Sequence, residues 1–355
     1  MFGVAKQSES FTKIWSGALT DYVTTLTWSP NGQFLTAASG AGEVSLLDVE
    51  RRQLTLLQEV EGQSIDCLAF SFDGQFLATA GQLGQVKIWQ FQAGSPQLIT
   101  TINTQSTWID QLVWSPINYQ LAFQQGFNVQ IWDAEKSAAV TTLDLTATAQ
   151  SLQWSPDGLS LAISSQNSVG IWKTSSWELE HYWETMAPSS ALAWSPDGNY
   201  IAAGGIDRTV TIWEWGDENP WSIQGFPGKV SQVVWSDQPN HMGVPLLVAS
   251  SNDGMVRWEK DRDHRIGWNS QVLKKHHAKV RSIAFQPHSF LLASAADDGQ
   301  ICLWHQAQDL SSTLKGATNG FSCLAWHPQG QQLAAGGQSG ELFIWSLTSS
   351  NDLSA

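Results

Sequence analysis

The sequence predicts an all-β protein built from a repeated four-stranded unit, and three observations lead to this prediction. The 355 residues include 20 tryptophans, most of which recur at a regular period. Only 14% of the residues are charged, against roughly 25% in an average soluble domain, which leaves few for the exposed faces of helices. Apolar residues alternate with polar ones over short runs, and this period of two is typical of strands.

A phrase containing Leu-x-Trp-Ser-Pro-Asp-Gly, then Leu-Ala, then Val-x-Ile-Trp, can be placed eight times along the chain, about 42 residues apart. Its first aromatic position holds Trp28, Phe70, Trp114, Trp154, Trp194, Trp235, Phe285 and Trp326. Its second holds Leu47, Trp89, Trp132, Trp172, Trp213, Trp258, Trp304 and Trp345. Six tryptophans from the first set and seven from the second make 13 of the 20 structural by position.

Each element of the unit follows from local sequence. The alternating pair Leu26 and Trp28 predicts a first strand, and Ser29-Pro30-Asn31-Gly32 predicts the tight turn after it. The Leu-Ala phrase gives the second strand, and a turn such as residues 205–208 leads to the third strand at Val-x-Ile-Trp. A Thr- or Leu-rich segment such as residues 97–102 supplies a fourth. Each unit should therefore form four antiparallel strands.

Four-stranded units of this length and pattern resemble WD40 repeats, which fold as blades of a β-propeller. The likeness covers about Thr12 to Trp345, and the regular Ser-Pro-Asp-Gly turns look like those of bacterial WD40 proteins. The Trp-Asp dipeptide that names the family occurs once, at Trp132-Asp133, so the repetition carries the resemblance. It implies one propeller domain over residues 1–355. The repeat units are about 11–50, 51–93, 94–136, 137–176, 177–217, 218–260, 270–308 and 309–346, with a polar insertion at 259–269.

The ends of the chain predict how the ring closes. The eighth unit has three strands and no fourth, while Phe11 to Trp15 is spaced from Trp28 as a fourth strand would be. In WD40 proteins such an N-terminal strand completes the last blade and removes its open edge. Eight units then give eight blades, although seven is the commoner number in the family.

The resemblance also implies a structural hydrogen-bond tetrad in the seventh unit, formed by His276, Ser294, Asp298 and Trp304. No other unit keeps all four residues. We therefore expect the rigidity between blades to come mainly from apolar packing.

The sixth unit departs from the pattern in two places. About five extra residues enlarge its first turn, within residues 236–245, and the polar insertion carries Lys260, Arg262, Arg265 and Trp268. Both should emerge on one rim. Eight basic and three acidic residues fall between Arg257 and Arg281, a local charge of about +5 (8 − 3). The two interpretations are a docking site for an acidic partner and a charged loop that is merely solvated.

The opposite rim gathers the segments before each first strand and the turns between second and third strands. Tyr22, Trp108 and Phe127 fall there. Exposed aromatic side chains commonly anchor protein interfaces, so these are candidate partner-binding residues. The alternative is that Trp108, directly before Ile109, caps the channel wall.

Composition narrows the function further. A formal net charge of -14 opposes binding to nucleic acid. No apolar run approaches the roughly 18 residues of a membrane span. Three cysteines without a CxxC motif, and a start without the layout of a signal peptide, favour a cytoplasmic setting. No nucleotide-loop, nucleophile-elbow or metal-ligand spacing is present, so we expect no cofactor, no bound metal and no enzyme activity.

These observations predict a protein–protein interaction scaffold, an adaptor or assembly factor, which is a monomer on its own. The alternative is a ligand- or metal-binding propeller, catalytic or not, with a site at the channel mouth.

Overall fold

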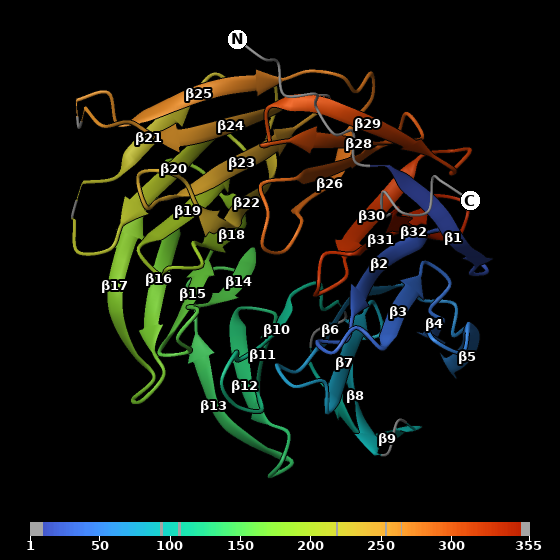
Figure 1. Ribbon diagram of the computed structural model, residues 1–355. Helices are drawn as coiled ribbons and strands as arrows, with labels where there is room; N and C mark the ends of the chain where they lie inside the picture. Colours follow the sequence, from blue (N-terminus) through green and yellow to red (C-terminus); the bar gives the residue numbers. More distant parts are fainter. Residues whose placement is uncertain are drawn as a thin grey trace.

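The computed structural model describes residues 10–92, 95–105, 108–217, 219–252, 254–263 and 265–348. Within these segments the chain forms 32 strands and no helix, arranged as eight four-stranded antiparallel sheets. The sheets follow one another around a ring as the blades of a propeller (Figure 1). This confirms the predicted fold and settles the blade count at eight.

Each blade runs from an inner strand beside the channel to an outer strand at the periphery. Blade one is β2 (Val23–Trp28), β3 (Phe34–Ser39), β4 (Val44–Asp48) and β5 (Gln53–Gln58). Blade two is β6 (Ile65–Phe70), β7 (Phe76–Gly81), β8 (Gln85–Gln92) and β9 (Ser95–Asn103). Blade three is β10 (Leu112–Trp114), β11 (Gln120–Gln125), β12 (Asn128–Asp133) and β13 (Ala138–Asp144). Blade four is β14 (Ser151–Trp154), β15 (Ser160–Ser164), β16 (Ser168–Lys173) and β17 (Glu178–Glu184).

The second half of the ring repeats the arrangement. Blade five is β18 (Ser189–Trp194), β19 (Tyr200–Gly205), β20 (Thr209–Glu214) and β21 (Trp221–Gln224). Blade six is β22 (Val230–Pro239), β23 (Pro245–Ser251), β24 (Gly254–Lys260) and β25 (Trp268–Leu273). Blade seven is β26 (Val280–Phe285), β27 (Leu292–Ala296), β28 (Gln300–His305) and β29 (Asp309–Lys315). Blade eight is β30 (Phe321–Trp326), β31 (Gln332–Gly337), β32 (Glu341–Leu347) and, from the other end of the chain, β1 (Phe11–Ala18).

The blades are displaced by one strand from the sequence units. A unit such as residues 51–93 holds β5, the outer strand of blade one, followed by the three inner strands of blade two. Each repeat in the sequence therefore spans two blades, and this links every blade covalently to the next.

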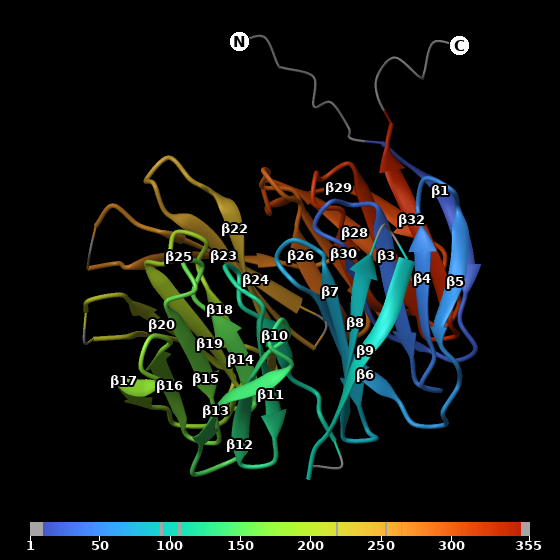
Figure 2. The same ribbon diagram turned by 90° about the horizontal axis from the view of Figure 1, so that it is seen from below.

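The N-terminal strand closes the ring as predicted. β1 pairs antiparallel with β32, from Phe11 opposite Leu347 to Ala18 opposite Glu341. The two strands lie side by side at one edge of the ring (Figure 2). The otherwise open edge of β32 is thus paired.

The tight turn after each inner strand is fixed by a serine. Ser195 Oγ donates to Asp197 Oδ1 at 2.5 Å and accepts a bond from the backbone N–H of Tyr200 at 2.8 Å. Ser29, Ser71 and Ser155 make the same pair of bonds in their turns. Gly198 has a φ of 73°, a left-handed conformation that favours glycine. The Ser-Pro-Asp-Gly phrase therefore encodes a turn that repeats around the ring.

The hydrophobic core lies between blades. The buried apolar side chains of the described residues form eight clusters, each contributed by two neighbouring blades. Leu35 and Leu47 of blade one, for example, pack with Ala334 and Ile344 of blade eight. A blade therefore buries its faces only against its neighbours.

Inner-strand tryptophans add a polar link that sequence reasoning missed. Trp114 Nε1 donates to the backbone oxygen of Ala69 in the preceding blade at 2.9 Å. Four more bonds at 3.1 to 3.2 Å repeat this geometry, from Trp28 to Ala325, Trp154 to Val113, Trp235 to Ala193 and Trp326 to Ala284. Trp194 differs, because its indole N–H is buried without a hydrogen-bond partner among the described residues. Blade-to-blade rigidity therefore does not come from apolar packing alone.

This difference between indoles yields a prediction. Phe already occupies the equivalent position at Phe70 and Phe285, so a Trp→Phe change preserves the aromatic packing. We expect Trp114→Phe to lower the free energy of unfolding by about 1 kcal/mol more than Trp194→Phe, because only the former leaves a backbone carbonyl without its donor. Denaturant unfolding of the two variants measures the difference. Equal losses would show that the indole bond contributes nothing net.

Candidate functional site

The inner strands carry a repeated irregularity at one end of the channel. Six of the eight, in blades one, two, five, six, seven and eight, have a register shift around their second residue. The residue there is Thr24, Asp66, Ser190, Ser231, Arg281 or Ser322. Such a β-bulge leaves the extra residue unpaired and re-aims its side chain. We call the end of the ring where the inner strands begin the inter-blade rim, and the opposite end the hairpin rim.

Three of the six bulge residues tie neighbouring blades together through their hydroxyls. The hydroxyl of Thr24 donates to the backbone oxygen of Ile65 at 2.5 Å, and that of Ser322 to Val23 at 2.5 Å. Ser190 makes the equivalent bond to Val230 at 3.3 Å. At Asp66 and Arg281 the bulge residue is instead charged. The sequence signal for these two was available, because the other four bulged strands have Ser or Thr at this position.

Both charged residues face a cavity at the channel mouth. The cavity holds about 510 Å³ and opens on the inter-blade rim. Its walls come from blades one, two, seven and eight and consist of Tyr22, Val23, Thr24, Asp66, Arg281, Ser322 and Gln338. The mouth thus combines an aromatic ring, a carboxylate, a guanidinium and an amide.

The acidic side of the mouth holds one of the predicted aromatics. Trp108 Nε1 donates to Asp66 Oδ2 at 2.7 Å, and Ser64 Oγ donates to the other carboxylate oxygen at 2.5 Å. Trp108 nevertheless stays 53% exposed. Burial of Asp110, opposed by a backbone hydrogen bond and assisted by the charge of Asp66, raises the pKa of its carboxyl. Trp108 is therefore an exposed aromatic fixed by its indole N–H, and it sits beside two carboxylates.

The basic side is organised around Arg281. Its Nε and Nη2 donate to the two carboxylate oxygens of Asp297 at 2.7 and 2.8 Å, and the Gln338 amide donates to the same carboxylate. The bidentate pair fixes the plane of the guanidinium. Burial, together with the charges of Arg281 and Lys229, lowers the pKa of Lys279. Several cations therefore gather on this side.

The other predicted aromatics of this rim behave differently. Tyr22 lines the mouth and is 41% exposed, and its ring lies so close to Gly40 that a Cβ there would come within 2.2 Å of it. Phe127 stands on the turn between β11 and β12, is 64% exposed and does not line the cavity. The structure thus places Tyr22 at the mouth and Trp108 against its wall residue Asp66, and leaves Phe127 outside.

The four residues of the implied tetrad form a continuous chain of bonds. Trp304 Nε1 donates to Ser294 Oγ at 2.9 Å, Ser294 Oγ lies 2.8 Å from His276 Nε2, and His276 Nδ1 lies 3.0 Å from Asp298 Oδ2. Because an indole can only donate, the serine hydroxyl is free to donate to Nε2, and Nδ1–H then donates to the carboxylate. The His276 side chain is 1% exposed. The set joins β27, β28 and the loops at the inter-blade rim.

The two insertions of blade six meet on the hairpin rim. The enlarged first turn extends β22 and β23 until Pro239 pairs with Pro245, and β24 and β25 extend until Lys260 pairs with Trp268. Asn240 Nδ2 donates to Glu259 Oε1 at 2.9 Å and links the two turns. We call this feature the blade-six lobe, residues 236–245 and 259–269, of which position 264 lies outside the described residues.

Two of the predicted partner-binding residues of the lobe are structural. Trp268 is 9% exposed and packs edge-on against Tyr200 and Trp235, so its assignment to partner binding was wrong. Lys260 Nζ donates to Glu214 Oε2 at 2.7 Å and to the Tyr200 hydroxyl at 2.9 Å. Burial acts to lower the pKa of Lys260, but these bonds and the adjacent negative charge raise it overall. Both side chains hold blade six against blade five.

The remaining lobe charges are largely compensated. Arg265 pairs with Asp263 at 2.6 Å while staying exposed, and Arg257 pairs with Glu259 at 2.7 Å. Arg262 is exposed, with its Nε 3.3 Å from Met242 Sδ. Of the eight basic residues counted between Arg257 and Arg281, four therefore lie in ion pairs: Arg257, Lys260, Arg265 and Arg281.

Metal binding and thiol reactivity have little support among the described residues. No cluster of three or more His, Cys, Asp or Glu side chains with ligand geometry occurs in the described segments. Cys67, Cys302 and Cys323 are free, and burial raises the pKa of the Cys302 and Cys323 thiols to about 11. None of the described segments forms a helix that could cross a membrane.

Comparison with family models identifies the repeats. The model described as "WD domain, G-beta repeat" matches residues 54–90, 185–214, 267–305 and 308–346. The model "Anaphase-promoting complex subunit 4 WD40 domain" matches residues 5–57.

Similar curated proteins share part of their length with this chain. WD repeat-containing protein srw1 of Schizosaccharomyces pombe is 26% identical over 155 residues, which are 42% of this chain and 26% of that protein. Anaphase-promoting complex subunit cdh1 of Dictyostelium discoideum is 28% identical over 153 residues, 41% of this chain and 19% of that protein. The matched segments thus span about a quarter or less of these relatives. Both are eukaryotic, so they give no support to the bacterial likeness.

A solved structure resembles the whole ring. Sqt1 from Chaetomium thermophilum superposes with a TM-score of 0.82 at 17% identity, over 96% of this chain and all of that one. At this identity the likeness concerns the fold alone.

The tetrad yields a prediction about stability. His276→Ala removes the imidazole partner of both the Asp298 carboxylate and the Ser294 hydroxyl in a buried setting, and should lower the free energy of unfolding by about 1 to 3 kcal/mol. His277→Ala is the matched control, because the exposed neighbour bonds Asp298 only through its backbone N–H. Denaturant unfolding of the two variants in the presence of a metal chelator compares their free energies of unfolding. If both variants unfold at the wild-type midpoint, the chain of bonds adds nothing to stability.

The lobe yields a second prediction. Lys260→Glu places a carboxylate against Glu214 at a site where the lysine side chain is only 13% exposed. We expect a loss of roughly 1 to 3 kcal/mol, since a partly buried ion pair becomes a repulsion. Arg262→Glu, on the exposed surface, should leave the melting temperature unchanged. Thermal unfolding tests both, and a stable Lys260→Glu variant would contradict the structural role.

Proposed function

Since the chain belongs to the WD40 repeat family, we propose that it is a protein–protein interaction platform that binds its partner at the channel mouth on the inter-blade rim. The observation that carries this proposal is the joint placement of Tyr22, Asp66 and Arg281 in the wall of one open cavity, with the exposed Trp108 bonded to Asp66. Exposed aromatic and arginine side chains are the residue types that contribute most energy to protein interfaces.

The mouth is already organised for binding. Trp108 is held by Asp66, and Arg281 by Asp297, so little side-chain entropy remains to be lost when a partner docks. Tyr22 lies against Gly40, which limits its movement. A partner therefore meets fixed anchors instead of loose side chains.

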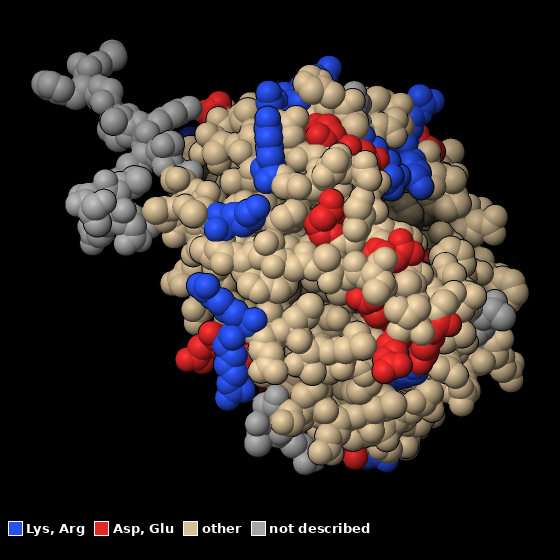
Figure 3. Space-filling view, turned by 90° about the vertical axis from the view of Figure 1, so that its right-hand side faces the viewer, with Lys and Arg blue, Asp and Glu red and all other residues tan. Residues whose placement is uncertain are grey.

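Charge adds orientation to this surface. The carboxylates of Asp66 and Asp110 stand on blades two and three, and the cations Arg281 and Lys279 on blade seven. Figure 3 shows one face of the molecule, where uncharged side chains cover most of the surface and charged ones stand in small groups. An acidic side and a basic side across one mouth favour a partner segment of opposite polarity and disfavour its reverse.

The relatives point in the same direction. One of them is named as a subunit of the anaphase-promoting complex, which is an assembly role. By analogy we propose an adaptor or assembly role for this chain, without enzyme activity or cofactor, in a cytoplasmic setting where the three free thiols stay reduced. We propose that the chain is a monomer before it binds a partner.

The test is affinity purification with the intact protein, followed by measurement of binding to the partner recovered at equal stoichiometry. Tyr22→Ala combined with Trp108→Ala should weaken binding by about 2 kcal/mol or more, mainly through a faster off-rate. Arg281→Glu should weaken it further.

Tyr182→Ala is the control, because Tyr182 is 53% exposed on β17, an outer strand away from the mouth. It should bind like the wild type. Recovery of no stoichiometric protein, or unaltered kinetics in the double variant, would overturn the proposal. Saturable binding of a small molecule at the mouth would favour the ligand-binding alternative.

A further inference from the structure

A second cavity lies on blade six, apart from the channel mouth. It holds about 730 Å³ and is walled by the segment 225–227, by β24 and β25, and by residues 274–277. Phe226 and Pro227 form one side, Val256 and Val272 the floor, and Lys274 and Lys275 the end. It shares no lining residue with the mouth cavity. We call it the blade-six groove.

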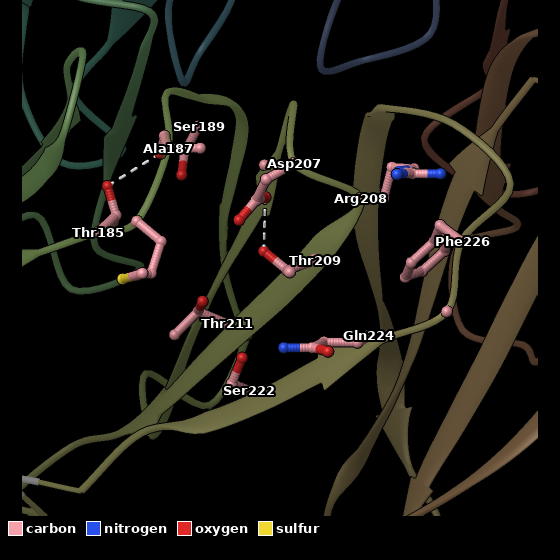
Figure 4. A pocket seen from close by; sticks show the side chains of 13 residues that line it. Thr185, Ala187, Ser189, Asp207, Arg208, Thr209, Thr211, Ser222, Gln224 and Phe226 are labelled. Carbon is pink, nitrogen blue, oxygen red and sulfur yellow. Dashed lines mark hydrogen bonds between the residues drawn. The ribbon is translucent and has the colours of Figure 1, made fainter.

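The groove has a counterpart in blade five that is polar. There a cavity of about 400 Å³ has Thr211 and Ser222 as the cross-strand pair on its floor, with Gln224 beyond them. Figure 4 shows these side chains pointing into that cavity. In blade six the same register holds Val256 opposite Val272, followed by Lys274. The two neighbouring grooves thus differ in floor and charge while sharing their geometry.

The aliphatic floor is peculiar to blade six among the described pairs at this register. The other seven pairs each contain at least one residue that is not aliphatic: Ser45–Leu56, Lys87–Thr101, Gln130–Thr142, Gly170–Tyr182, Thr211–Ser222, Cys302–Thr313 and Phe343–Ser16. Val272 is 56% exposed. Val256 is half-buried. Covering this partly exposed aliphatic pair with an apolar side chain is favourable, because it removes apolar surface from water.

The end of the groove is cationic. Lys274 and Lys275 are exposed, and neither has a carboxylate partner among the described residues. In a chain of net charge -14 this contrasts with the lobe of the same blade, where Lys260 and Arg265 are paired. Part of the positive charge that the sequence places in this region is therefore available at the groove on the inter-blade rim, while on the lobe only Arg262 is exposed without a carboxylate partner among the described residues.

We propose that the blade-six groove binds a segment of a partner protein that carries one large apolar side chain followed closely by two or more acidic residues. The apolar side chain covers Val256 and Val272 against Phe226, and the acidic residues lie over Lys274 and Lys275. Apolar burial supplies most of the affinity, and the charges fix the direction of the segment.

The test is selection of binders from a random 16-residue peptide display library on the intact protein, with the affinity of enriched peptides measured by fluorescence anisotropy at several salt concentrations. Enriched peptides should share the apolar-then-acidic pattern. Their affinity should fall as salt rises, because the two lysines are exposed.

Variants locate the site. Val272→Arg should weaken binding of the enriched peptides about tenfold or more, and Lys274→Glu with Lys275→Glu by a similar factor. Ser222→Arg is the matched control, since it introduces the same arginine side chain at the equivalent position of blade five. This variant should bind the enriched peptides like the wild type. Tyr22→Ala with Trp108→Ala should also bind like the wild type, which separates this site from the proposed mouth.

Several outcomes would overturn the inference. They are the absence of enriched peptides, enriched peptides without acidic residues, and unaltered affinity in Val272→Arg when circular dichroism shows that it is folded. Vesicles of phosphatidylserine and phosphatidylcholine are assayed in parallel. Vesicle binding that depends on Lys274 and Lys275, with no peptide selected, would replace the protein segment by a membrane surface.

Discussion

The structure depends on one constraint: a four-stranded blade cannot bury its own faces, so each must pack against the next until the ring closes. All eight apolar clusters of the described residues are shared by two blades. Five inner-strand indoles bond the preceding blade, and β1 supplies the last outer strand from the opposite end of the chain. The stability of any one blade is therefore inseparable from that of its neighbours.

Rigidity gained in this way makes the inter-blade rim suitable for recognition. The inner strands are fixed on both sides, so a bulge at their second residue can aim a side chain at the mouth without disturbing the sheet. Three of the hydroxyls at this place link blades, whereas Asp66 and Arg281 present charge. The same position of the repeat can therefore either bond the next blade or place a charge at the channel mouth, depending on its side chain.

Blade six shows how a departure from the repeat is absorbed. Its insertions extend two hairpins, bury Trp268 and pair Lys260 with Glu214 of blade five. The lobe therefore mainly stabilises the contact between blades five and six. Elsewhere in the same blade, the groove beside 225–227 holds the aliphatic pair Val256 and Val272 and two lysines that have no carboxylate partner among the described residues. A count of charged residues along a segment does not show which of their side chains are left without an ion-pair partner.

The sequence by itself determined the strands and the eight units, because period-two alternation, turn residues and a repeat of about 42 residues are local properties that recur. The closing strand was predicted from its spacing together with the resemblance to WD40 repeats, and the tetrad from that resemblance. Only the tertiary structure decided which polar groups meet across blades. The bonds of Trp114 to Ala69, Trp108 to Asp66 and Lys260 to Glu214 join residues 42 to 46 positions apart. Their formation depends on the angle and spacing of neighbouring sheets, which no single repeat encodes. The burial of Trp268 and the exposure of Lys274 follow from that same packing.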